Sequence, residues 1–419
     1  MAHLTSIRGP VLQAPLRDVA VGERCQVYAG LWADSPCAQA EVIGITTSGA
    51  VLSLEGDSKG LSTRSVVVPT GATFRIGVDA ALLGRLVDEN GQVWDGGQHV
   101  PMRVPEQWRA IDGAAPDYHE RVPVEEVFAT GVRAIDALLT CGQGQRVGVF
   151  APAGAGKTSL VAMLLRGCEA EVFVVALVGE RGRELAEFLA DGIAPENRAR
   201  TVVVACTSDR PAAQRVKTVL MATTIAEYFR DAGRRVVLIV DSITRYARAL
   251  REVALAAGEM PARGGYPASV LDALPRVLER AGATRRGSIT AFYTVLVEDD
   301  QGSDPIGEEV RAILDGHIVL SRDLAGRGHY PPIDVLASVS RVAPRVAPPE
   351  LIASATHVRT TLARLDELKL MIELGEYREG ENPEVDDVLA RKSGLMALLV
   401  QPMDEHTAWD DMLEAVRHV

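Results

Sequence analysis

The eight residues Ala151-Pro-Ala-Gly-Ala-Gly-Lys-Thr158 constrain the fold of this 419-residue chain more than any other feature. They follow an apolar run, Arg146–Phe150, and open a helical stretch, which is the setting that a phosphate-binding loop requires. Gly154 and Gly156 allow the backbone to turn consecutive N–H groups inward, so that these amides and the helix N-terminus form an anion cradle. The general pattern begins with glycine where this chain has Ala151, but the remaining residues still predict a loop that binds nucleotide phosphates.

Two side chains of this loop have specific tasks in phosphate and metal binding. Lys157 can reach the β- and γ-phosphates of ATP, and we expect it to face solvent when the loop is empty. The Thr158 hydroxyl can ligate Mg²⁺. ATP and Mg²⁺ are therefore the expected ligands. The residues expected to contact the nucleotide in this loop are Ala153, Gly154, Ala155, Gly156, Lys157, Thr158 and Ser159.

Two carboxylates follow apolar runs that are typical of buried strands. Asp241 comes directly after Val236–Val240, and ligands of parallel sheets bind beyond the carboxyl ends of the strands. We therefore predict that Asp241 holds Mg²⁺, although by itself it would also fit the N-cap of a helix. Glu180 follows Glu171–Val178 and could orient the water that attacks ATP. Its position fits a glutamate in the first turn of a helix equally well.

Three regions differ in pattern, and they predict an N-terminal β-barrel (1–75), a connector with an α/β core (76–348) and a helical C-terminal domain (349–419). Short β-rich runs without a helical period indicate a small barrel or sandwich. Strand-like runs that alternate with helical stretches predict a mostly parallel sheet covered on both faces. The predicted strands of the first region are Gln26–Leu31, Glu41–Thr46, Val51–Leu54 and Ser65–Pro69; those of the core are Arg146–Phe150, Glu171–Val178, Thr201–Cys206, Val236–Val240, Ser288–Val297 and His317–Leu320.

Helices are predicted where apolar residues recur at helical spacing. Between Pro211 and Asp231 they recur with the one-face spacing of an amphipathic helix. Only helical spacing remains after Pro349, and it predicts helices over about 349–376, 384–400 and 404–417. Residues 76–120 carry turn signals and several prolines, which indicate a connector.

The charge of the chain argues against one class of partner and suggests another. A net charge of -12 disfavours nonspecific nucleic-acid binding, which needs clustered basic side chains. From residue 349 onward, fifteen acidic side chains face seven basic ones, a balance of -8, whereas residues 1–75 carry six of each. The acidic end is either a solvated helical surface or a docking face for a basic partner. Without a signal peptide or a long apolar run, the cytoplasm is the expected compartment.

The core resembles the catalytic subunits of F-type rotary ATPases and their export relatives, and within them the ATPases of bacterial type III secretion injectisomes. The strings that carry the resemblance include Gly142-Gln-Gly-Gln-Arg-Val-Gly-Val-Phe150, Val178-Gly-Glu-Arg181, Asp241-Ser-Ile-Thr-Arg-Tyr-Ala247 and His329-Tyr-Pro-Pro-Ile-Asp334. The resemblance implies that Glu180 is the catalytic glutamate, that Arg181 and Arg245 lie near the γ-phosphate, and that Tyr330 packs on adenine. It further implies that Arg341 is an arginine finger supplied to the neighbouring subunit.

The same resemblance implies a quaternary structure and a cellular function. We expect a homohexameric ring that associates peripherally with the cytoplasmic face of the bacterial inner membrane. ATP hydrolysis would release export substrates from chaperones and help to unfold them. The implied partners are a central stalk protein, a stator and chaperone–substrate complexes, with no nucleic acid.

Three alternatives share the ATP-binding core. A flagellar export ATPase is the nearest of them in motif. A proton-driven rotary ATPase needs distinct catalytic and non-catalytic chains, whereas this chain carries both Glu180 and Arg341. A nucleic-acid translocase would need an N-terminal domain with basic and aromatic side chains, and residues 1–75 have zero net charge and few aromatic residues.

Overall fold

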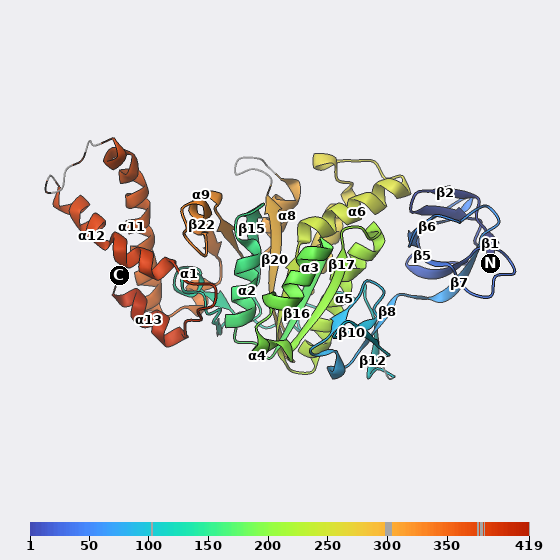
Figure 1. The fold of residues 1–419 in the computed structure, drawn as a ribbon, viewed down its shortest axis with the longest axis horizontal. Helices are drawn as coiled ribbons and strands as arrows, with labels where there is room; N and C mark the ends of the chain where they lie inside the picture. Colours follow the sequence, from blue (N-terminus) through green and yellow to red (C-terminus); the bar gives the residue numbers. More distant parts are fainter. Residues whose placement is uncertain (102–103, 298–303, 375–376, 378–379, 381, 419) are drawn as a thin grey trace.

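The computed structural model describes residues 1–101, 104–297, 304–374, 377, 380 and 382–418, which form three bodies along one long axis (Figure 1). A β-barrel lies at the end that holds the N-terminus, an α/β core lies in the middle, and helices form the other end. The expected fold class is confirmed. The domain boundaries at residues 75 and 348 stay a prediction.

The N-terminal body is a seven-stranded antiparallel sheet with the order β1-β7-β4-β5-β6-β3-β2. Only Leu4 and Thr5 separate β1 from β2, the two end strands, so the sheet curls until its edges meet. Side chains of β4 alternate between buried and partly exposed, as one closed face requires, and Cys25 and Val27 point into the core. Its strands are β1 (Ala2–His3), β2 (Ser6–Arg8), β3 (Val11–Ala14), β4 (Glu23–Tyr28), β5 (Ala38–Thr46), β6 (Gly49–Glu55) and β7 (Val66–Thr73).

The core contains a sheet in which β9, β17, β16, β18, β20, β15 and β21 run parallel in that order. All six strands predicted for the core are present. The main strands are β15 (Arg146–Pro152), β16 (Val172–Glu180), β17 (Thr201–Thr207), β18 (Arg235–Asp241), β20 (Ser288–Val297) and β21 (Gly316–Leu320), and β22 (Ile333–Ser340) adds an antiparallel edge. Long apolar runs form these strands because helices cover both faces of the sheet.

The connector is more regular than its turn signals indicated. Its strand β9 (Leu86–Val87) pairs with β17 and extends the central sheet through β10 (Val93–Asp95) and β11 (Gln98–Val100). Another strand, β12 (Gln107–Ala110), pairs with β8 (Arg75–Val78). These strands are two to four residues long, too short for a period-2 pattern to stand out. Short strands are β13 (Val127–Phe128), β14 (Cys141–Gly142) and β19 (Gly282–Ala283).

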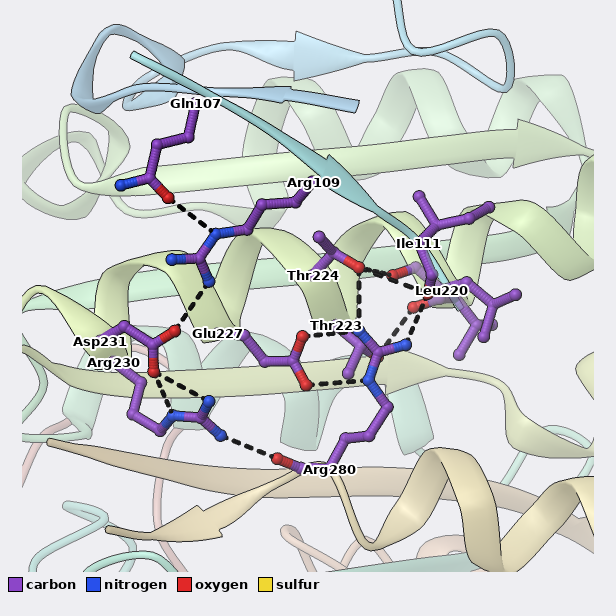
Figure 2. A network of polar contacts seen from close by, with 11 residues as sticks. Gln107, Arg109, Ile111, Leu220, Thr223, Thr224, Glu227, Arg230, Asp231 and Arg280 are labelled. Carbon is purple, nitrogen blue, oxygen red and sulfur yellow. Dashed lines mark hydrogen bonds and ion pairs between the residues drawn. The ribbon is translucent and has the colours of Figure 1, made fainter. Parts of the chain in front are cut away.

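Helix α5 (Ala212–Asp231) occupies the predicted span, but the prediction of an amphipathic helix is wrong. It is buried almost all round, because it packs on the sheet while barrel strand β6 and connector strand β8 cover its other side. Its charged side chains are therefore neutralised internally. Lys217 contacts Glu41 and Glu55 of the barrel, and Glu227 pairs with the fully buried Arg280 (Figure 2).

The remaining helices flank the core sheet or form the C-terminal body. They are α1 (Arg133–Leu138), α2 (Lys157–Gly167), α3 (Gly182–Glu187), α4 (Pro195–Arg198), α6 (Ile243–Ala257), α7 (Ala268–Leu278), α8 (Pro305–Ile313), α9 (Arg322–Gly326), α10 (Ala343–Val346), α11 (Pro349–Glu373), α12 (Pro383–Leu399) and α13 (Trp409–Arg417), with the short turns η1 (Ala80–Leu82), η2 (Phe188–Gly192) and η3 (Arg263–Gly265).

The C-terminal body contains the three predicted helices with shifted ends. Residues 375–376, predicted as the end of the first helix, lie outside the described residues, and α11 ends at Glu373. The third helix begins at Trp409 rather than 404, because the preceding segment leaves α12 in extended form and is hydrogen-bonded to the core. None of the helices in the described ranges is both long and apolar enough to span a bilayer.

Candidate active site

The phosphate loop connects β15 to α2, and its backbone has the shape that the two glycines predict. Gly154 and Gly156 both take positive φ angles, 80° and 78°. A Cβ atom on Gly156 would lie 3.3 Å from Pro332 Cγ and 3.6 Å from Tyr330 Cε1. Glycine is therefore needed here both for the backbone conformation and for the close approach of the 330–332 turn.

Lys157 does not face solvent, and that expectation is wrong. Its side chain is only 13% exposed. The ammonium group contacts Asp241 Oδ1 and lies 3.8 Å from Glu180 Oε1. One lysine thus stands between two carboxylates at the carboxyl ends of β16 and β18. These carboxylates are the acceptors that the ammonium group of Lys157 reaches.

Asp241 is the last residue of β18 and is 5% exposed. The N-cap of α6 is Ser242, whose side chain accepts from Arg245 N, so Asp241 does not have the capping role that position alone allowed. Thr294 of β20 donates its hydroxyl to Asp241 Oδ1 at 2.8 Å. Strand register aligns Val240 with Tyr293, which brings the next residue of each strand together.

Glu180 is the last residue of β16, and the acidic residue in the first turn of the following helix is Glu184 instead. Arg245 Nη1 lies 2.7 Å from Glu180 Oε2 and also donates to Gly179 O at 2.6 Å. Within the described part of the chain, Glu180 Oε1 is buried without a hydrogen-bond partner. Burial, followed by the charge of Asp241, raises the pKa of Glu180 above its ordinary value, while Lys157 and Arg245 act in the opposite direction.

The oxygen donors at this site fit Mg²⁺. Nowhere in the described ranges do three or more His, Cys, Asp or Glu side chains form a group that could hold a metal. An ion here would have few protein ligands: the Asp241 carboxylate lies in the cluster at the end of β18, and Thr158 lies exposed in the first turn of α2. Mg²⁺ is typically bound by one or two protein oxygens together with substrate phosphates and water.

The other candidate residues lie at the rim or away from this cluster. The Arg181 side chain is 77% exposed and pairs with Glu184 at 3.3 Å. Tyr330 is 45% exposed and lies beside the phosphate loop. Arg341 follows edge strand β22 and donates to Arg311 O at 3.3 Å. Among the described residues, Arg341 has no hydrogen bond or ion pair with the cluster of Lys157, Glu180 and Asp241.

Sequence analysis missed Thr294, although one signal could have found it. A strand run that includes a threonine near its carboxyl end, next to a strand that ends in aspartate, places a hydroxyl beside that carboxylate. Detecting this requires the order of the strands in the sheet. β18 and β20 are neighbours there but are separated by α6 and α7 along the chain.

Two family models match the chain. The nucleotide-binding domain of the ATP synthase alpha/beta family matches residues 131–340, and the C-terminal domain of the type III secretion ATPase EscN matches residues 347–418. The chain is 51% identical to the SPI-1 type 3 secretion system ATPase of Salmonella typhi, covering 99% of this chain and 96% of the relative. A flagellum-specific ATP synthase of Treponema pallidum is 41% identical to this chain, and the match covers 99% of this chain and 92% of the relative.

Solved structures show the same likeness. The assembled ATPase EscN from the enteropathogenic E. coli type III secretion system is 40% identical, with a TM-score of 0.93 over 100% of this chain and 99% of the EscN chain. EscN in complex with its central stalk EscO matches over the same shares at 40% identity and a TM-score of 0.90.

Proposed function

The chain belongs to the family of type III secretion system ATPases and is an ATPase, and we propose that it works as a homohexameric ring that energises protein export. In this proposal, ATP hydrolysis releases export substrates from chaperones and helps to unfold them. The single observation that carries the catalytic part is the convergence of Lys157, Glu180, Asp241 and Arg245 beside the phosphate loop.

We infer a division of labour in which each group acts on one part of the reaction. The loop amides and Lys157 bind the phosphates. When Lys157 binds phosphate, its ammonium group exchanges the carboxylates of Asp241 and Glu180 for phosphate oxygens. Glu180 accepts a hydrogen bond from the attacking water and orients it, with Arg245 holding one of its oxygens. Thr158 and Asp241 would hold Mg²⁺, which when bound would supply positive charge to the phosphates. Tyr330, exposed beside the loop, offers a face for adenine.

The raised pKa of Glu180 supports its role as the group that positions water. A carboxylate buried near another carboxylate is a stronger base than one in solvent. The oxygen without a hydrogen bond, Oε1, is the one available to that water.

The proposed role of Arg341 requires the ring, because the arginine would act in the active site of the adjacent subunit. The side chain is exposed and outside its own chain's cluster, as a finger for an adjacent subunit should be. One chain that carries both Glu180 and Arg341 can build every active site of a ring by itself. The similar EscN is described as assembled, and in complex with a central stalk, which supports self-association and a stalk partner here.

The remaining partners and the location are proposed from the family. They are a stator, chaperone–substrate complexes and a peripheral site on the cytoplasmic face of the inner membrane. Identity favours the injectisome role over the flagellar one, since named type 3 secretion relatives reach 51% and the flagellum-specific relative stands at 41%. The acidic C-terminal helices are the proposed docking face for a basic partner.

Replacing Glu180 with glutamine tests the catalytic assignment. Glu180→Gln should bind ATP but hydrolyse it roughly 10²- to 10⁴-fold more slowly, because the amide cannot act as a base. Turnover and ATP-induced thermal stabilisation should be measured together, since a ligand that binds the native state raises its apparent stability. Loss of ATP binding would assign Glu180 a structural role instead.

Mixing two inactive variants tests the ring. Arg341→Ala should bind ATP almost normally and lose about 10³-fold or more in turnover, the scale attributed to arginine fingers. Lys157→Ala keeps its finger, so mixed rings contain interfaces with an intact loop and an intact finger, and activity should partly return. Mixed hexamers confirmed by mass that stay inactive at every ratio would count against a finger acting between subunits.

A further inference from the structure

The segment between α12 and α13, residues 400–408, connects the C-terminal helices to the nucleotide site. Its anchor is Gln401, which is 1% exposed although it lies between two surface helices. The side chain accepts from Arg133 N at 2.8 Å and donates to Gly131 O at 2.8 Å and Glu405 O at 3.1 Å. Every polar atom of this buried amide is thus paired, which fixes its position.

Arg133 holds the same segment from the core side. It donates to the carbonyl oxygens of Leu398 at 3.3 Å and Val400 at 2.6 Å, at the C-terminus of α12 where helical carbonyls lack partners. It also reaches Thr407 Oγ1 at 3.1 Å. Both ends of segment 400–408 are therefore tied to one arginine of α1.

The backbone of Gln401 contacts Tyr330, the residue on which adenine is proposed to pack. Its N–H donates to Tyr330 O at 2.8 Å. Within the described part of the chain this is the only hydrogen bond that Tyr330 makes, by backbone or side chain. Tyr330 in turn lies against Gly156 of the phosphate loop. This bond joins the main chains of the two residues, so the anchored side chain of Gln401 fixes where its N–H meets Tyr330 O.

We propose that Gln401 is a positioning residue for the substrate: it holds Tyr330 at the phosphate loop, so that the C-terminal helices set the affinity of the site for the adenine base. This rests on the proposed packing of adenine on Tyr330. Stacking on adenine acts equally in the ground state and in the transition state, so Gln401 influences binding of ATP and leaves the chemical step unchanged.

Replacing Gln401 should weaken binding of ligands that carry the adenine base and leave binding of the phosphates unchanged. Gln401→Ala keeps the main-chain bond to Tyr330 but removes the three side-chain hydrogen bonds that anchor segment 400–408. Because the segment and Tyr330 then lose their fixed position, KM for ATP should rise about tenfold and kcat should change less than about twofold. Inhibition by inorganic pyrophosphate, which has no base, should keep its constant. Gln401→Met, with similar volume and no polar atoms, repeats the measurement without an alanine cavity. An unchanged KM in the folded variants, or an equal weakening of pyrophosphate, overturns the proposal.

Two controls separate this proposal from its premise. Tyr330→Ala should raise KM for ATP at least as much as Gln401→Ala; if it does not, the adenine assignment fails, whatever Gln401 does. Glu414→Gln changes an exposed residue of α13 outside the segment and should leave both constants as they are.

Hydrogen exchange tests the link in the unmodified protein. ATP should slow hydrogen exchange in the peptide covering 400–408 more than pyrophosphate does, because only ATP has a base that can pack on Tyr330. Equal protection by the two ligands would show that the segment does not respond to the base, and would overturn the proposal.

Discussion

The network around Arg280 and the cluster around Lys157 both contain buried charges, yet they differ in how completely their hydrogen-bonding atoms are paired. Arg280, in the connection between α7 and β19, donates to Glu227 at 2.8 and 2.6 Å, to Ile111 O at 2.6 Å and to Thr224 at 2.9 Å (Figure 2). Arg230 donates to Arg280 O at 3.1 Å. The geometry is bidentate, and both charges are neutralised.

The cluster at the carboxyl ends of the strands is paired only in part. One ammonium group serves two carboxylates, and Glu180 Oε1 stays without a hydrogen bond among the described residues. Lys157 and Arg245 balance the charges of the two carboxylates, but one buried carboxylate oxygen is left for a further donor, whereas each guanidinium nitrogen of Arg280 donates to a partner. The difference teaches that complete pairing indicates a structural role and incomplete pairing indicates a place for a ligand.

Removing the lysine should give the largest effect on activity. Lys157→Ala should lower turnover by at least about three orders of magnitude, because charge on the transferring phosphoryl group loses its cation. The free energy of unfolding should fall by less than the roughly 3–5 kcal/mol typical of breaking a buried pair, since Arg245 still neutralises Glu180 and Thr294 still donates to Asp241. Turnover and urea denaturation measure the two quantities. Near-normal turnover in a folded variant would refute the phosphate-loop assignment.

Removing the arginine should give the opposite result. Arg280→Met leaves Glu227 buried without its partner, which should cost about 3–5 kcal/mol of stability. KM for ATP in the protein that remains folded should stay within about twofold. The double variant Arg280→Met/Glu227→Leu should regain part of the loss, because a buried pair can be replaced by apolar groups. A large change in KM without loss of stability would contradict the structural role assigned to the Arg280 network.

Removing one hydroxyl should give the smallest effect. Thr294→Val deletes the donor to Asp241 Oδ1 and should lower turnover about tenfold, as expected for a hydrogen bond to a charged group. Thr294→Ser keeps the hydroxyl and serves as the control, and its turnover should stay within about threefold of the original. Equal losses in the two variants would mean that packing, and not the hydroxyl, matters at this position.

Sequence patterns were reliable where neighbouring residues decide the outcome. The phosphate loop, the six core strands and the span of α5 all follow from local spacing. The solvent exposure of Lys157 and the amphipathic character of α5 were predicted wrongly for one shared reason. Each depends on what packs against the element from elsewhere in the chain: Asp241 in the first case, and strands β6 and β8 in the second.

The sequence by itself determined which chemical groups this protein has and on which elements they lie. Gly156 must follow β15, and Asp241 must end β18, because strand and turn propensities act over a few residues. Tertiary structure decided which of these groups meet. Thr294 reaches Asp241 across two neighbouring strands, and Gln401 reaches Tyr330 from another body of the molecule. Contacts of this kind depend on sheet order and on the docking of whole elements, which are set by the burial of apolar surface over the entire chain.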